Sequence, residues 1–197
     1  MPDRPRTPES GHGAMIAHGL VFLRPAERED LPRFVAWLSD VRTSRTLALR
    51  SPLSLAMEQG WFERVVERQG SEIWHFVICR LADGRPVGAI DLHDIDLTNG
   101  SAGLGIVIGD PADTGQGYGS DALRALLGFG FGELRLERIW LDVYDFNERA
   151  RHVYERVGFV HEGTLRRAMF RGGVFHDVHR MSVLRDEWVA ASDRTGG

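Results

Sequence analysis

The stretch of sequence that decides the fold reads Thr114-Gly115-Gln116-Gly117-Tyr118-Gly119-Ser120. Its three glycines alternate and stand directly before a run of apolar residues at helical spacing. Glycine lets the backbone adopt positive φ angles and approach a ligand closely. The free N–H groups and the dipole at the start of a helix favour an anion. The stretch is therefore either a flexible turn with a glycine cap or a cradle for a diphosphate.

Two other phosphate-binding motifs come close to this pattern. Gly117-x-Gly119-x-x-Ala122 matches the dinucleotide fingerprint, and Asp142 follows Ala122 by 20 residues, where a ribose-binding acid is expected. In that fold, however, the first glycine follows its strand closely. Here eight residues, 109–116, lie between the strand and Gly117, and only 55 residues follow Asp142. A P-loop is excluded because no Lys-Ser or Lys-Thr pair follows the glycines.

Hydrophobic periodicity on both sides of the loop predicts the remaining elements. The expected strands are 20–24, 73–81, 87–92, 102–108 and 138–144, with late strands near Phe159 and over 181–184. The expected helices cover 31–38, 54–68, a segment beginning near Gly117, and Glu148–Val157. The order is β-α-α-β-β-β-α-β-α-β-β. An order of this kind predicts a mixed sheet with helices on its faces, of the α+β class.

Length and composition are those of an ordinary globular chain. The 197 residues fit one domain, which we place at 19–189, with an N-terminal tail over 1–18 and a C-terminal tail over 190–197. A net charge of −4 argues against a general nucleic-acid binder. No apolar run reaches the roughly 18 residues of a membrane span, and the N-terminus has no signal-peptide core. The lone Cys79 sits in an apolar run and predicts a buried thiol, compatible with a cytoplasmic location.

Several blocks in this order resemble the GCN5-related N-acetyltransferase (GNAT) superfamily. The sequence looks most like the branch that contains ribosomal-protein alanine and spermidine acetyltransferases. The blocks are Ile108-Gly109-Asp110, Gly115 to Ala122, Leu136-Glu137-Arg138-Ile139, Asn147 to Tyr154, Gly158-Phe159, Glu162-Gly163, Asp177, Met181 and Glu187-Trp188. The resemblance covers residues 20–188 and implies a three-layer α/β/α fold. Its central sheet would be mixed and mostly antiparallel, with helices on both faces.

The resemblance implies an acetyl-CoA-dependent N-acetyltransferase, in which a primary amine attacks the thioester directly and no metal takes part. The superfamily signature is Arg/Gln-x-x-Gly-x-Gly/Ala. Gly117 and Gly119 match it, whereas Thr114 replaces the usual long side chain. This departure spares the backbone amides that bind the pyrophosphate in similar proteins. The residues implied for the co-substrate are Ile106, Val107, Ile108, Thr114, Gly115, Gln116, Gly117, Tyr118, Gly119, Ser120 and Asn147.

Asn147 and Tyr154 form a second group of candidate site residues. They are seven residues apart, so two helical turns bring them to one face, about 10 Å apart along the axis. Asn147 is a favoured helix N-cap, and it either caps alone or caps and also contacts the co-substrate. Tyr154 is either a packed aromatic or, as the resemblance implies, the acid that protonates the departing thiolate.

The sequence leaves the general base and the acceptor open. Some relatives have an acidic residue where Gly103 stands, or a serine where Ala150 stands, and neither is present here. The candidate bases are Asp91, Asp94, Glu162, His75, His93, His176 and His179, or a base acting through water. Residues 37–61 and 166–175 are expected to shape the acceptor pocket. The basic run of Arg166, Arg167 and Arg171 is either a solvated hairpin or an attractor for an acidic group.

Three points about partners stay as expectations. The acceptor is a primary amine, carried by a small molecule or a protein N-terminus. An exposed edge strand would permit a homodimer. A second class of function is a non-catalytic acyl-CoA-binding or sensing module on the same fold, since no base is identified.

Overall fold

A single eight-stranded sheet organises the molecule. The computed structural model describes residues 16–50 and 52–195, and the strands follow the order β1-β2-β3-β4-β5-β6-β8-β7. Every neighbouring pair is antiparallel except β5 and β6, which are parallel. The expected mixed, mostly antiparallel sheet is confirmed. The strands are β1 (Ile16–His18), β2 (Val21–Pro25), β3 (Trp74–Arg80), β4 (Pro86–Asp96), β5 (Ser101–Ile108), β6 (Arg138–Tyr144), β7 (Val160–Arg171) and β8 (Val174–Leu184).

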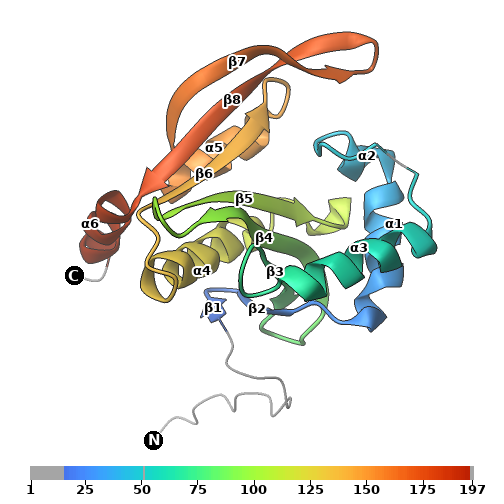
Figure 1. The fold of residues 1–197 in the computed structure, drawn as a ribbon, viewed down its shortest axis with the longest axis horizontal. Coiled ribbons are helices and arrows are strands. Elements are labelled where there is room, and N and C mark those ends of the chain that lie inside the picture. The colour runs from blue at the N-terminus through green and yellow to red at the C-terminus, as the bar shows by residue number, and fades with distance from the viewer. Residues whose placement is uncertain (1–15, 51, 196–197) are drawn as a thin grey trace, which may run out of the picture.

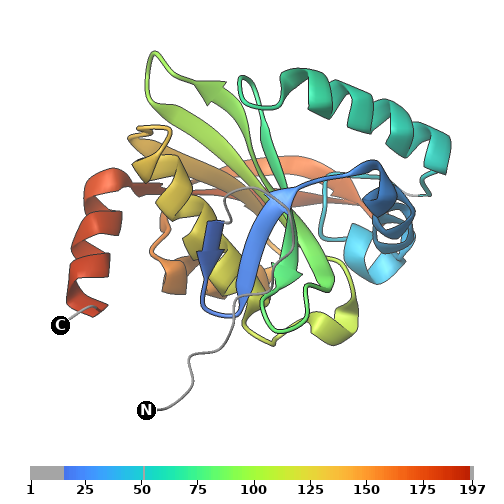
Figure 2. The ribbon, with the colours of Figure 1, turned by 90° about the horizontal axis from the view of Figure 1, so that it is seen from below.

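Helices cover both faces of the sheet, which gives the three expected layers. The helices are α1 (Leu31–Ser39), α2 (Val41–Ser44), α3 (Leu55–Arg68), α4 (Tyr118–Gly132), α5 (Glu148–Val157) and α6 (Arg185–Thr195). Figure 2 shows α1, α2 and α3 on one side of the strands and α4 with α6 on the other. Two 3-10 turns, Arg28–Asp30 and Pro111–Asp113, precede α1 and α4.

Apolar side chains alternate along β3 between the two faces of the sheet, so helices must pack on both faces. Phe76 and Ile78 point into the large core cluster beneath α4, whereas Val77 and Cys79 point into a smaller cluster beneath α1 and α3. All four are at most 4% exposed, as expected for a central strand with period-two alternation. Cys79 is a buried free thiol, as the sequence predicted.

Local signals set the ends of the helices near the site. The Ser54 side chain accepts a hydrogen bond from Met57 N at 3.2 Å and so begins α3. The Asn147 side chain accepts one from Ala150 N at 3.4 Å and begins α5, which ends at Gly158 with φ of 115°. The capping role expected of Asn147 is therefore confirmed.

Three elements were not expected from the sequence: β1, α2 and α6. β1 and α2 span only three and four residues, too few to show a period. β7 and β8 also run much further than expected, because most of β7 is exposed and lacks the apolar alternation that marks a half-buried strand. Residues 1–15, most of the expected N-terminal tail, lie outside the described residues. The domain boundaries at 19 and 189 stay predictions. β1 lies within the expected N-terminal tail, and α6 extends across the expected C-terminal boundary.

The sheet opens where β5 leaves β6. The two strands pair only between residues 101–103 and 138–140. Beyond that point β5 stays paired with β4, while β6 stays paired with β8. Figure 1 shows β6, β7 and β8 turning away from β5 and forming an arch that reaches toward α2. The backbones of residues 104–108 and 141–144 therefore diverge and bound an open wedge in the sheet.

Candidate active site

The glycine loop lies between the end of β5 and the start of α4. Gly115 and Gly117 have φ angles of 84° and 91°, which favour glycine over residues with a side chain. Gly117 is the N-cap of α4 and makes no side-chain capping bond, so the first amides of the helix stay available. A Cβ added at Gly115 would meet no atom within 4 Å, so this side of the loop faces open space. These features fit an anion held by backbone N–H groups.

Ion pairs and hydrogen bonds hold the loop in place. Arg85 forms a two-pronged bond with Asp113 in the turn before the loop, at 2.9 and 2.5 Å. The Asp121 carboxylate accepts a hydrogen bond from Leu20 N at 2.9 Å and so ties the first turn of α4 to β2. The loop therefore has a rigid support on each side.

The end of β5 adjoins this loop. Ile106 and Ile108 pack at the edge of the large core cluster, and Ile108 lies 3.7 Å from the position of a Cβ on Gly119. Val107 points to the opposite face and packs on the smaller cluster. The end of β5 and the start of α4 are thus adjacent at the open wedge.

Tyr154 lies on the same face of the sheet as the loop. It packs against the large core cluster, as Ile106, Ile108 and Tyr118 do, and its ring centroid is 5.9 Å from that of Phe159. Burial raises the pKa of Tyr154 to about 12, which keeps the phenol protonated at neutral pH. The hydroxyl is thus a proton donor set in an otherwise apolar surrounding.

A pocket lies on the other face, beneath α1 and α3. Its volume is about 820 Å³, and β5 forms part of its wall through Gly105, Ile106 and Val107. The pocket therefore meets the end of β5 from the side opposite Tyr154. The other lining residues are Phe34, Trp37, Leu38, Leu47, Ala48, Leu49, Leu53, Ala56, Met57, Glu58, Gly60, Trp61, Arg64, His75, Ala89 and Asp91.

Asp91 occupies the position on this face that Gly105 leaves free. The two residues are directly paired across β4 and β5, and a Cβ on Gly105 would lie 2.8 Å from Asp91 Oδ2. His93 Nδ1 lies 2.7 Å from Asp91 Oδ1, and His75 Nδ1 lies 3.9 Å from Asp91 Oδ2. The hydrogen bond to Asp91 raises the pKa of His93, whereas burial lowers the pKa of His75. A carboxylate flanked by two imidazoles thus faces the pocket at the β5 strand.

Side chains from neighbouring strands also occupy the space beside Gly103. A Cβ on Gly103 would lie 2.6 Å from His93 Nε2 and 3.0 Å from the Trp140 ring. A side chain at position 103 would require the His93 and Trp140 rings to shift. The space beside Gly103 is therefore filled by His93 from β4 and Trp140 from β6.

Other candidate bases are engaged elsewhere. Glu162 accepts hydrogen bonds from Ser182 at 2.7 Å and from Arg138, and the bond from Ser182 contributes most to lowering its pKa. His176 pairs with Asp145 at 3.1 Å, and His179 with Thr164 at 3.0 Å. The structure brings Asp91, His75 and His93 together and leaves these three candidates outside the pocket.

Asp94 and the basic run also lie outside this cluster. Asp94 is exposed and lines a smaller pocket beside His93. Arg166 and Arg167 are exposed on β7, while the Arg171 guanidinium donates to the carbonyls of Leu47 and Leu49 at 2.5 and 2.9 Å. Arg171 therefore fastens the β7–β8 hairpin to the loop that lines the pocket.

Sequence reasoning missed Glu58. It is 4% exposed, and burial raises the pKa of its carboxyl. The available signal was its place in an otherwise apolar stretch of α3, three residues before Trp61, because i and i+3 share a helix face. Its role as a pocket residue becomes visible only when α1 and α3 are packed together.

Within residues 16–50 and 52–195, no group of three or more His, Cys, Asp and Glu side chains is arranged to hold a metal ion. No helix in the same part of the chain is long and apolar enough to cross a bilayer.

Comparisons with known proteins agree with this geometry. Residues 21–160 match the acetyltransferase (GNAT) domain, so the chain belongs to the GNAT family of acetyltransferases. It is 30% identical to the spermidine N(1)-acetyltransferase of Escherichia coli K12 over 177 residues, which span 89% of this chain and 92% of that protein. A match to the Bacillus subtilis protein YdaF is 37% identical over 108 residues, covering 55% of this chain and 58% of that protein.

A solved structure extends the likeness to three dimensions. Spermidine N-acetyltransferase from Vibrio cholerae, in complex with CoA and spermine, superposes with a TM-score of 0.79 at 27% identity. The match covers 86% of this chain and 98% of that one. The chain is thus a GNAT-fold enzyme that transfers an acetyl group from acetyl-CoA to an amine.

Proposed function

We propose that this enzyme acetylates a small-molecule primary amine, which enters from the pocket under α1 and α3. The proposal rests on one observation: two halves of a candidate site lie on opposite sides of β5 and meet at that strand. The glycine loop and Tyr154 lie on the α4 side of β5, and the pocket with Asp91 lies on the other side. Both half-sites share the strand segment 105–108.

The glycine loop fits the co-substrate. When bound, acetyl-CoA supplies an activated acetyl group as a thioester. Residues 114–120 would hold its pyrophosphate through backbone N–H groups at the start of α4. Residues 106–108 would orient the thioester carbonyl with a backbone donor, which stabilises the negative charge that develops on oxygen. Asn147, which already caps α5, would contact the same molecule.

Tyr154 would act as the acid. Its pKa of about 12 keeps a proton on Oη over the working range of pH. The leaving thiolate is a stronger base inside an apolar surrounding than in water, so a nearby phenol can protonate it.

Asp91 would act as the base. It lies opposite Gly105 and faces the pocket from which the amine would come. His93 holds one carboxylate oxygen at 2.7 Å and leaves the other directed toward His75 at 3.9 Å. An amine that displaces water from this gap would pass its proton to Asp91 and become nucleophilic.

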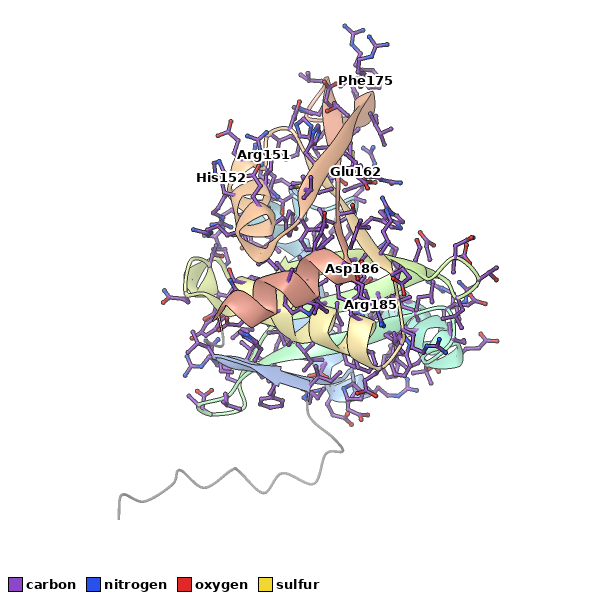
Figure 3. The ribbon with its side chains drawn as sticks, turned by 90° about the vertical axis from the view of Figure 1, so that its left-hand side faces the viewer. Arg151, His152, Glu162, Phe175, Arg185 and Asp186 are labelled. Carbon is purple, nitrogen blue, oxygen red and sulfur yellow. The ribbon has the colours of Figure 1, made fainter. Side chains whose placement is uncertain are left out.

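The proposal also includes the oligomeric state of the enzyme. We propose a homodimer that forms through the β7–β8 hairpin, because β7 is an edge strand and exposes Leu165 and Phe170. Figure 3 shows the hairpin projecting from the body with Phe175, 60% exposed, toward its far end. A related enzyme from Vibrio cholerae is described as a dodecamer. Size-exclusion chromatography with light scattering tests the dimer, and a monomer at all concentrations would contradict it.

A cytoplasmic location also stays a proposal. Its support is the single, buried and free Cys79, which suits a reducing compartment.

The experiment that tests the function is thiol release from acetyl-CoA against a panel of primary amines. We expect amine-dependent turnover, and we expect Tyr154→Phe to reduce it. The alternative, a non-catalytic acyl-CoA sensor, predicts binding of acetyl-CoA in calorimetry without turnover on any amine of the panel.

A further inference from the structure

Gly109 lies between the two segments that are proposed to hold the co-substrate. It follows β5 directly, is buried, and donates from its N–H to the carbonyl of Val87 at 2.9 Å. Residues 106–108 precede it, and the Pro111–Asp113 turn leads from it to the glycine loop at 114–120. The position of Gly109 therefore affects both segments at once.

A hydroxyl from α2 fixes the carbonyl group of Gly109. Thr43 is 7% exposed, and its Oγ1 donates to the Gly109 carbonyl at 3.0 Å. Both backbone polar groups of Gly109 thus have a partner, one from β4 and one from α2. Because an unpaired buried carbonyl is costly, this bond holds Gly109 against α2.

An aromatic ring from α1 covers the Cα of Gly109. A Cβ on Gly109 would overlap the Trp37 ring, so this close approach requires glycine. The same ring lines the pocket beneath α1 and α3, as Val107 of β5 does. Trp37 therefore contacts the backbone that leaves β5 and also forms part of the wall proposed to receive the acceptor.

α2 is itself held in place, so Thr43 is a firm support for Gly109. Leu47 N donates to the Ser44 carbonyl at 3.1 Å. Arg171 of β7 in turn donates to the Leu47 carbonyl at 2.5 Å. Leu47 lines the pocket, so the bond from Thr43 connects the pocket wall to the end of β5.

We propose that Trp37 and Thr43 are positioning residues for acetyl transfer, which align the end of β5 with the acceptor pocket through Gly109. This alignment decides how a backbone donor of residues 106–108 meets the thioester carbonyl while the amine approaches from the pocket. A misplacement of about 1 Å can lower a rate by about 100-fold, so contacts outside the reacting groups can act on the reaction. The inference rests on the proposed function and names the residues that align its two halves.

Two substitutions at position 43 test the hydrogen bond. Thr43→Val keeps the shape and removes the donor, whereas Thr43→Ser keeps the donor. The substrates are acetyl-CoA and the amine of the panel that gives the fastest turnover. We expect Thr43→Val to lower kcat about tenfold and to leave both KM values within about twofold, the signature of lost alignment in the transition state. Thr43→Ser should keep kcat within about twofold of the unmodified enzyme.

A purely structural bond predicts a different result. Thr43→Val would then lower the midpoint of denaturant unfolding and leave kcat per folded enzyme unchanged, which would overturn the inference. Equal kcat values for Thr43→Val and Thr43→Ser would also overturn it. If the unmodified enzyme turns over no amine of the panel, the proposed function fails first and this inference fails with it.

A compensating pair tests the ring contact. Gly109→Ala places a methyl group where the Trp37 ring lies, and we expect kcat/KM for the amine to fall about tenfold. Trp37→Leu removes the overlap, so the double variant should lose less than the product of the two single losses, by about threefold or more. Gly128→Ala, with open space around its Cβ, is the matched control, and its effect should multiply with that of Trp37→Leu. Losses that also multiply for Gly109→Ala would overturn the proposed contact. If Gly109→Ala does not fold, the pair at position 43 decides the inference.

Discussion

Tyr154 and Asp91, the proposed acid and base, lie on opposite faces of the sheet. Tyr154 belongs to the apolar cluster beneath α4, whereas Asp91 faces the pocket beneath α3. Their surroundings suit opposite tasks. Burial keeps the proton on the phenol, while His93 shares a hydrogen bond with the carboxylate that is proposed to receive a proton. We propose that this separation lets one residue give a proton while the other takes one.

Tyr154→Phe removes only the hydroxyl and keeps the ring that packs near Phe159. We expect kcat to fall about 100-fold or more, the usual contribution of a positioned acid, with KM for acetyl-CoA little changed. Steady-state kinetics at neutral pH measure this. Circular dichroism confirms that the variant is folded, and an undiminished kcat would remove Tyr154 from the mechanism.

Asp91→Asn tests the base and its histidine partner together. We expect kcat/KM for the amine to fall about 100-fold. The pKa of His93 should also fall, because the hydrogen bond to Asp91 is what raises it most. NMR titration of the His93 ring, assigned with a His93→Gln variant, measures the change. An imidazole that titrates at the same pH in both proteins would contradict the contact.

At the scale of the elements, the junction between the glycine loop and α4 is the feature that we propose binds the co-substrate. Its shape depends on backbone angles that only glycine adopts easily, at Gly115 and Gly117. The open wedge depends on β5 and β6 parting after three paired residues. The acceptor side depends on the loop between α2 and α3, which the β7–β8 hairpin holds through Arg171.

Gly117→Ala forces a side chain onto a residue with φ of 91° and places its Cβ 3.5 Å from Leu20. We expect stability to fall by about 1 kcal/mol and the affinity for CoA to weaken about tenfold. Gly128→Ala is the control, since it lies in the middle of α4 with open space around its Cβ. It should stabilise the fold by about 0.5–1 kcal/mol and leave CoA affinity unchanged. Calorimetry and denaturant unfolding measure both variants, and equal CoA affinities would contradict the proposed cradle.

Arg171→Met breaks the bonds to the carbonyls of Leu47 and Leu49 but keeps a long apolar stem. We expect a loss of about 1–2 kcal/mol in stability and a higher KM for the amine, because Leu47 and Leu49 line its pocket. The dissociation constant for CoA should stay the same. Arg166→Met, at an exposed position of the same strand, should change neither quantity. A KM shift of equal size in both variants would show that general charge, and not this contact, matters.

At the scale of the whole molecule, the parts that the sequence predicted are those with local signals. The glycine loop, α5 with its Asn147 cap and the apolar strand β3 all show their character within a dozen residues. The acceptor pocket has no such signal, because Glu58, His75, Asp91 and Gly105 come from one helix and three strands. Only the sheet register, which sets Asp91 opposite Gly105, brings the proposed base to the strand.

For the same reason, the general base could not be assigned from the sequence alone. A carboxylate on a strand and a glycine on its neighbour are common residues, and neither marks a site by itself. The antiparallel register of β4 and β5 converts them into a carboxylate that fills the space of a missing side chain. The long β7–β8 hairpin was underestimated because its exposed residues carry no hydrophobic period.

The most direct test of the central claim follows the acetyl group itself. Isotope-labelled acetyl-CoA is incubated with the enzyme and a primary amine of the panel, and mass spectrometry quantifies labelled amide and free CoA over time. We expect one labelled acetyl group on the amine for each CoA released, at a rate that Tyr154→Phe strongly reduces. Release of CoA without labelled product on this or any other amine of the panel, or bound acetyl-CoA that stays intact, would contradict it.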